Sequence, residues 1–160
     1  MIAALGLIGW SGYRNYQLRR ASASLHTPQM VLVPDNSTLA ASSANFMSSR
    51  MDVRVGERRV FEPDAVVRLG QRLPSMDYLV TDPVIIVEVL SPSTQMRDFG
   101  IKLESYLLLH SVQHYLIVDA EERRIVHHRR IGADRFETAI RGDAKLTLDP
   151  PGITIERFFP

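Results

Sequence analysis

From residue 50 onward, polar and apolar residues alternate in a way that predicts β-strands. Residues 51–55 (MDVRV) alternate with period two, a Gly-Glu pair follows at 56–57, and apolar residues return at 60–61. This pattern predicts a β-hairpin. A further strand is predicted over residues 64–69 (DAVVRL), and a polar loop that contains two prolines follows at 71–83.

Two continuous apolar runs predict the centre of the fold. Residues 84–90 (VIIVEVL) are mostly β-branched, which is typical of a strand covered on both faces. Residues 113–119 (QHYLIVD) predict a second covered strand, and Ser93 or Thr94 can cap a helix between the two. The apolar face of that helix is predicted to contain Phe99, Leu103, Tyr106, Leu107 and His110. The order strand, helix, strand indicates a parallel pair joined by a helical crossover.

The remaining pattern completes a mixed α/β (α+β) fold. Residues 124–129 and 135–140 predict an antiparallel hairpin, and residues 153–155 predict a short closing strand after a Pro-Pro-Gly turn. We therefore expect one domain over residues 50–160. Residues 1–49 include a long stretch rich in Ser, Ala, Pro and Asn, and predict an atypical N-terminal segment that is helical or partly disordered.

Composition narrows the class of protein. With 160 residues, 45% of them hydrophobic and 23% charged, the chain has the balance of one soluble domain. It contains no cysteine, which excludes disulfides, thiolate zinc sites and cysteine nucleophiles and fits a cytoplasmic location. The net charge of +1 does not by itself indicate a nucleic-acid partner. The apolar start, MIAALGLIGW, is about half as long as a membrane span and follows no basic residue, so we expect no membrane association.

Glu88 is the residue that most needs explanation, because it interrupts the apolar run VIIVEVL. A buried carboxylate costs several kcal/mol unless a cation, a metal or hydrogen-bond donors compensate it. Two simpler interpretations stay open: Glu88 pairs with an arginine, or it lies at the open end of the strand beside solvent.

Asp64 and Lys102 are the other candidates for chemistry. Asp64 opens the preceding strand, so its carboxylate and that of Glu88 can meet and bind Mg²⁺ or Mn²⁺. Lys102, about two turns into the helix, can reach back to orient a water or offset charge on a phosphate. The simpler alternatives are a turn role for Asp64 after Pro63 and an i,i+4 pair between Asp98 and Lys102.

The histidines and serines offer weaker candidates. His110 and His114 have i,i+4 spacing, but a new strand is predicted to begin between them. His127 and His128 are adjacent on a strand and must point to opposite faces. A hydrolase triad built on Ser91 or Ser93 has no support in the sequence.

The segments FEPDAVV, VIIVEVLSPST, DFGIKLESY and HYLIVD, together with the closing PGITIERFF, resemble the Uma-two family of restriction endonucleases. That family belongs to the PD-(D/E)xK nuclease-like superfamily, and the resemblance covers roughly residues 50–160. It implies a restriction-endonuclease-like core, with a mixed central β-sheet flanked by helices, that hydrolyses nucleic-acid phosphodiesters with a divalent metal. The expected partner is a nucleic acid, DNA in the first place, and cleavage of both strands would favour a homodimer.

The resemblance also implies roles for particular residues. Asp64 and Glu88 match the two metal-binding acids, and Val89 matches the residue whose backbone carbonyl completes the metal shell. Leu90 stands where the superfamily pattern has lysine, and Lys102 matches the lysine that this family carries on the following helix. Residues 1–49 do not show the cluster of Arg, Glu and Gly that the family's usual opening helix carries, and no glutamate precedes Glu57. The alternative is therefore a catalytically degenerate module that binds nucleic acid or protein on the same fold.

Overall fold

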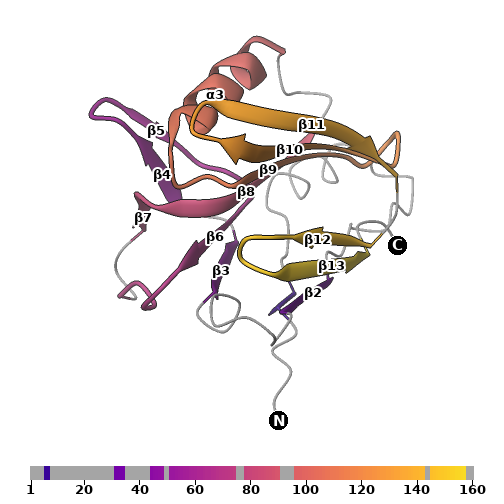
Figure 1. Ribbon diagram of the computed structural model, residues 1–160. Helices are drawn as coiled ribbons and strands as arrows, with labels where there is room; N and C mark the ends of the chain where they lie inside the picture. The colour runs from indigo at the N-terminus through magenta and orange to yellow at the C-terminus, as the bar shows by residue number, and fades with distance from the viewer. Residues whose placement is uncertain are drawn as a thin grey trace, which may run out of the picture.

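A computed structural model describes the chain at residues 6–7, 31–34, 44–48, 51–74, 78–90, 96–142 and 145–157. These residues form thirteen strands and one helix (Figure 1). The strands are β1 (Gly6–Leu7), β2 (Val31–Pro34), β3 (Ala44–Ser48), β4 (Asp52–Val55), β5 (Arg59–Phe61), β6 (Ala65–Leu69), β7 (Leu79–Val80), β8 (Pro83–Leu90), β9 (His114–Asp119), β10 (Arg124–Gly132), β11 (Arg135–Arg141), β12 (Leu146–Leu148) and β13 (Ile153–Arg157). The helix is α3 (Met96–Leu108).

A six-stranded sheet in the order β11-β10-β9-β8-β6-β3 forms the centre of the molecule. Its inner pair, β8 and β9, is parallel, while every other neighbouring pair is antiparallel. The chain passes from β8 through α3 to β9, so the predicted helical crossover is confirmed. The prediction of a mixed central sheet with residues 84–90 in an inner strand is confirmed as well.

The central sheet is covered on both faces, which explains why β8 and β9 read as continuous apolar runs. On one face, Val66, Ile86 and Tyr115 pack with residues of α3 and of a three-stranded sheet in the order β5-β4-β7. On the other face, residues of β12 and β13 pack against the sheet. These two strands belong to a four-stranded sheet in the order β1-β2-β13-β12 (Figure 1). We refer to the two sides as the helix face and the strand face.

Several short strands were not predicted. β7 lies inside the segment expected to be a loop, and β12 precedes the predicted closing strand. Within residues 1–49, β2 pairs with β13 and β3 pairs with β6, so both segments join sheets of the following domain. Short strands of this kind carry too few alternating residues for the pattern to register.

The predicted helix is present, with one correction at its end. α3 ends at Leu108, and His110 lies beyond it and is exposed, so His110 does not belong to the apolar face. The predicted caps Ser93 and Thr94, and the side chain of Phe99, lie outside the described residues. Among the residues described here, no helix is long and apolar enough to cross a membrane.

Candidate metal and hydrolytic site

The strand pairing brings Asp64 and Glu88 to the same place. β6 and β8 are antiparallel with Ala65 opposite Val87, so continuing this register by one residue sets Asp64 opposite Glu88. Because side chains alternate along a strand, both carboxylates share the face of Val66 and Ile86, which is the helix face. The predicted meeting of the two acids therefore follows directly from the sheet register.

Glu88 is buried, with 6% of its surface exposed, and it is held by two side chains of α3. The Lys102 Nζ atom lies 2.9 Å from Oε1 and 3.0 Å from Oε2 of Glu88. The Tyr106 hydroxyl donates a hydrogen bond of 3.2 Å to Oε1. Lys102 and Tyr106 are four residues apart, so one face of the helix supplies both donors.

This geometry decides between the alternatives for Glu88. The cation beside Glu88 is Lys102 rather than an arginine, and the lysine reaches back from the helix to the sheet. Its Nζ also lies 3.5 Å from the carbonyl oxygen of Glu62, just before the Pro63-Asp64 pair. The side chain of Asp98, the competing partner, lies outside the described residues.

Asp64 is tied to the backbone of the neighbouring strand. Its Oδ2 atom accepts a hydrogen bond of 2.7 Å from the Val89 N–H. In an extended strand the N–H and C=O of one residue point toward the same edge, so the Val89 carbonyl is directed toward the Asp64 side of β8. The turn role considered for Asp64 therefore does not account for its contact.

Burial dominates the electrostatics of this cluster. It raises the pKa of Glu88 to about 7, and the negative charge of Asp64 adds to the increase. Lys102 and Tyr106 oppose it because both stabilise the ionised carboxylate. Burial and the nearby carboxylates raise the pKa of Tyr106 far above its usual range, so its phenol stays protonated and donates to Glu88.

The donor set suits a hard divalent cation. Two carboxylates and a backbone carbonyl are the oxygen ligands that Mg²⁺ and Mn²⁺ accept, with water filling the other positions. A bound cation would also favour the ionised form of Glu88, which burial disfavours. Within the described ranges, no group of three or more His, Asp or Glu side chains is arranged to hold a metal. The candidate metal ligands are Asp64, Glu88 and the Val89 carbonyl, and their role in binding a cation stays a prediction.

Comparison with known proteins then places the chain in a family. Residues 35–155 match the model of the Uma2 family, described as "Putative restriction endonuclease". The chain belongs to the Uma2 family. An uncharacterized protein of Synechocystis sp. is 30% identical to this Uma2 chain over 93 residues, which are 58% of the chain and 49% of the relative. The chain thus spans about half the length of that curated relative.

A solved structure supports the fold of this Uma2 protein. It is the crystal structure of "a putative nuclease belonging to DUF820" from Anabaena variabilis, with a TM-score of 0.51 and 19% sequence identity. The similarity covers 66% of this chain and 58% of the other. At this identity the likeness concerns the fold, and it agrees with the restriction-endonuclease-like class expected from the sequence.

His114 and His127 of this Uma2 protein lie on the opposite, strand face of the sheet. His114 and His127 are both buried, with 2.9 Å between Nδ1 of His114 and Nε2 of His127. Nε2 of His114 lies 2.9 Å from the carbonyl oxygen of Pro150. His128 points the other way, against Tyr115, so the prediction that His127 and His128 face opposite sides is confirmed. Ser91 and Ser93 lie outside the described residues.

Sequence reasoning missed the polar role of Tyr106. The helical spacing predicts Tyr106 on the apolar helix face, and its ring is indeed packed edge-on between Phe61 and Tyr115. Its hydroxyl nevertheless reaches Glu88. The available signal was its spacing of four residues from Lys102, which predicts that both side chains project from one helix face.

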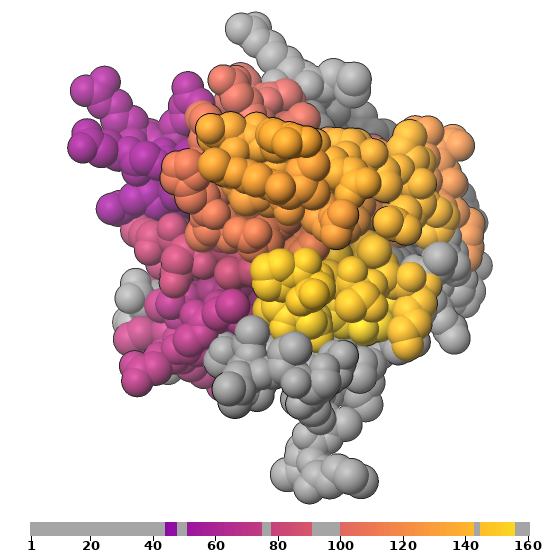
Figure 2. Space-filling view, viewed as in Figure 1, coloured from indigo at the N-terminus to yellow at the C-terminus, as the bar shows by residue number. Residues whose placement is uncertain are grey.

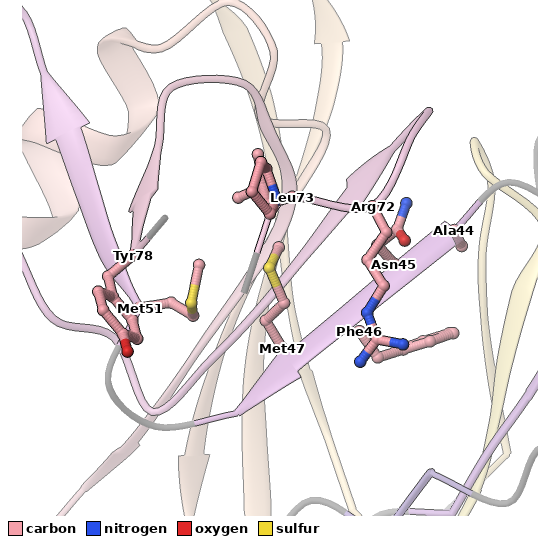
Figure 3. Close-up of a pocket in the computed structure, with 9 residues that line it drawn as sticks. Ala44, Asn45, Phe46, Met47, Met51, Arg72, Leu73 and Tyr78 are labelled. Carbon is pink, nitrogen blue, oxygen red and sulfur yellow. The ribbon is translucent and has the colours of Figure 1, made fainter. Parts of the chain in front are cut away.

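A separate cavity of about 380 Å³ lies between β3 and the segments that flank β4 and β7 (Figure 3). Its lining includes the apolar side chains of Phe46, Met47 and Met51, together with Tyr78 and Arg72. None of its described lining residues is a carboxylate or a histidine. This cavity therefore lies apart from the Glu88 cluster and shares none of its residues.

Proposed function

We propose that this protein is a metal-dependent endonuclease that hydrolyses phosphodiester bonds in DNA. The observation that carries the proposal is the buried Glu88 carboxylate, opposite Asp64 and within 3.0 Å of the Lys102 ammonium. Membership of the Uma2 family supports it, since the family is described as "Putative restriction endonuclease". Two acids on one sheet face, with a lysine from the helix that covers that face, fit this reaction.

In this proposal Asp64, Glu88 and the Val89 carbonyl hold Mg²⁺ or Mn²⁺. The ion supplies Lewis acidity at the phosphate and lowers the pKa of a bound water. Lys102 orients the attacking water and stabilises negative charge on the phosphate. Water adds to phosphorus and the bond to one ester oxygen breaks, which yields a phosphate monoester and a hydroxyl group.

Tyr106 has a supporting part in the same proposal. Its hydroxyl holds one oxygen of Glu88, and its ring is fixed by Phe61 and Tyr115. Glu88 therefore keeps a defined direction even when Lys102 turns toward a phosphate. Orientation of this kind contributes because the barrier rises steeply when reacting groups are misplaced.

The second candidate is a degenerate nuclease fold that binds nucleic acid or protein without cleaving. One observation favours it: both oxygens of Glu88 already contact Lys102, so the pair is complete as it stands. The composition of residues 1–49 points the same way, because they contain no glutamate that could match the acid of the family's usual opening helix.

The deciding experiment incubates the full chain with supercoiled plasmid in Mg²⁺ or Mn²⁺. We expect nicking that disappears with a chelator and with Glu88→Ala. A folded protein that leaves the plasmid intact at every metal concentration would reject the endonuclease and favour the binding module. Cleavage that persists in the chelator or in Glu88→Ala would reject this site.

A further inference from the structure

The β4–β5 hairpin stands out from the body of the molecule beside α3. Figure 1 shows the two strands projecting past the helix, and in Figure 2 the same segment protrudes as a purple lobe. Val53 and Val55 face inward and are buried. Arg54 lies opposite Val60 on the outer side, and both are exposed. The hairpin thus has one side fixed to the core and one side open to a partner.

Arginines dominate the charge of this hairpin. Residues 54–59 (RVGERR) contain three arginines and one acid, Glu57. Arg54 on the outer side and Arg58 in the turn are exposed. Neither has a side-chain ion-pair partner in the part of the chain that the structure describes. Gly56 has a φ of +63°, which permits the tight turn that presents Arg58.

The hairpin is also anchored directly to the candidate site. Nη1 of Arg59 lies 3.1 Å from Oγ of Ser105, which adjoins Tyr106 on α3. The ring of Phe61, at the end of β5, packs edge-on against Tyr106 with 5.6 Å between ring centroids. The next residue, Glu62, offers its carbonyl oxygen to Lys102. The position of the hairpin relative to Glu88 is therefore set by direct contacts.

We propose that the β4–β5 hairpin binds duplex DNA, with Arg54 and Arg58 on backbone phosphates. The inference rests on the proposed function, because it supplies the surface that holds the substrate at that site. A two-stranded ribbon fits the major groove of B-DNA, about 12 Å wide, whereas the major groove of A-form RNA is too deep and narrow.

The reach of the hairpin agrees with this arrangement. Arg58 and Asp64 are six positions apart in the chain, and six steps of about 3.3 Å span at most about 20 Å. That length corresponds to about six base pairs at about 3.4 Å each. One duplex can therefore contact the turn of the hairpin and present a phosphate to Asp64, Glu88 and Lys102.

The test measures binding separately from cleavage. The full chain is titrated against a fluorescein-labelled 30-bp DNA duplex in a chelator, at several salt concentrations. The Arg54→Gln/Arg58→Gln double variant is compared with Arg135→Gln/Arg141→Gln, which removes two exposed arginines from the edge strand β11. Arg54→Lys/Arg58→Lys restores the charge, and thermal melting checks that each variant is folded.

We expect the hairpin glutamine variant to bind at least about tenfold more weakly and to lose about 2 from its salt-dependence slope. The β11 variant should stay within about twofold of the wild type, and the lysine variant should recover most of the binding. Equal losses in the hairpin and β11 variants would overturn the proposal, as would equal binding of an RNA duplex of the same sequence. Hairpin-dependent binding without cleavage in any metal would instead reject the endonuclease and leave the DNA-binding surface in place.

Discussion

The central sheet carries a buried polar cluster on each face, and the two clusters differ in charge. On the helix face, Glu88 is an acid beside a second acid and an ammonium. On the strand face, His114 and His127 are hydrogen-bonded to each other, and His114 is also hydrogen-bonded to the backbone carbonyl of Pro150. Each cluster lies on a face of the sheet that also carries its own buried apolar core.

The difference lies in how each cluster satisfies its hydrogen bonds. A carbonyl can only accept, so Nε2 of His114 donates to Pro150 and its Nδ1 accepts from Nε2 of His127. Both imidazoles are neutral in this arrangement, and burial lowers the pKa of each to about 4. For Glu88, burial instead raises the pKa to about 7, and its partner is the Lys102 ammonium. We infer that the strand-face cluster is structural and that the helix-face cluster is functional.

The largest expected effect is the loss of cleavage when Lys102 is replaced, and Lys145, the other lysine of the chain, provides the control. Lys102→Met should lower plasmid cleavage by about 10²- to 10³-fold, because it removes the cation that stabilises charge at the phosphate. Lys145→Met removes the other lysine, which is exposed and lies next to β12, and should leave the rate within about twofold. Initial nicking rates measure both. Equal rates for the two variants would remove Lys102 from the reaction.

The strand-face pair should instead affect stability as a function of pH. In the folded chain His114 and His127 each have a pKa of about 4, below the usual value of 6.5. Between these two pH values the unfolded chain therefore binds protons that the folded chain excludes. Stability is therefore unaffected above about pH 6.5 and falls as the pH drops toward 4, by up to about 2 kcal/mol per histidine at pH 5.

Urea unfolding at pH 7 and pH 5 measures this loss. His127→Leu should remove the contribution of one histidine, up to about 2 kcal/mol, from the difference in stability between the two pH values. His110→Gln, which replaces an exposed histidine beyond the helix, should leave the difference in stability between the two pH values unchanged. An unchanged pH dependence in His127→Leu would show that the pair does not titrate in the way its burial implies.

The smallest effects separate two neighbouring tyrosines. Tyr106 and Tyr115 lie 5.4 Å apart between ring centroids, and only the first has a hydroxyl partner among the described residues. Tyr106→Phe should cost about 1 to 2 kcal/mol because it removes a hydrogen bond to a charged acceptor. Tyr115→Phe should change stability by no more than about 0.5 kcal/mol, or increase it, because it removes a buried hydroxyl without a partner. Denaturant midpoints that are equal for the two variants would contradict this distinction.

The sequence predicted the parts of the fold that carry strong local patterns. Residues 84–90 and 113–119 were recognisable as strands because burial on both faces requires a continuous apolar run. β7 and β12 were missed because each has too few residues for a local pattern. They are strands because β7 pairs with β4 and β12 pairs with β13. Pairing between distant segments leaves little local trace in a short strand.

The site was predictable to a similar extent. Glu88 was found because one acid in an apolar run must be compensated, but the residues alone left its partner open. Lys102 was assigned by resemblance, and the contact with Glu88 required the placement of α3 over the sheet. The hydroxyl of Tyr106 was missed because a tyrosine on an apolar helix face is most often a packing residue. Its hydrogen bond to Glu88 exists only once the helix lies over the sheet.

The most direct test of the helix-face cluster is plasmid nicking by Asp64→Asn in Mg²⁺ or Mn²⁺, beside wild type and His127→Leu. Asparagine keeps an oxygen that can accept the Val89 N–H, so the fold is retained while one negative charge is lost. We predict that nicking falls by at least about 100-fold in Asp64→Asn, from lost metal affinity and lost charge stabilisation, and that His127→Leu stays within about twofold of wild type. Unchanged nicking by Asp64→Asn would contradict the assignment of this face as the catalytic one.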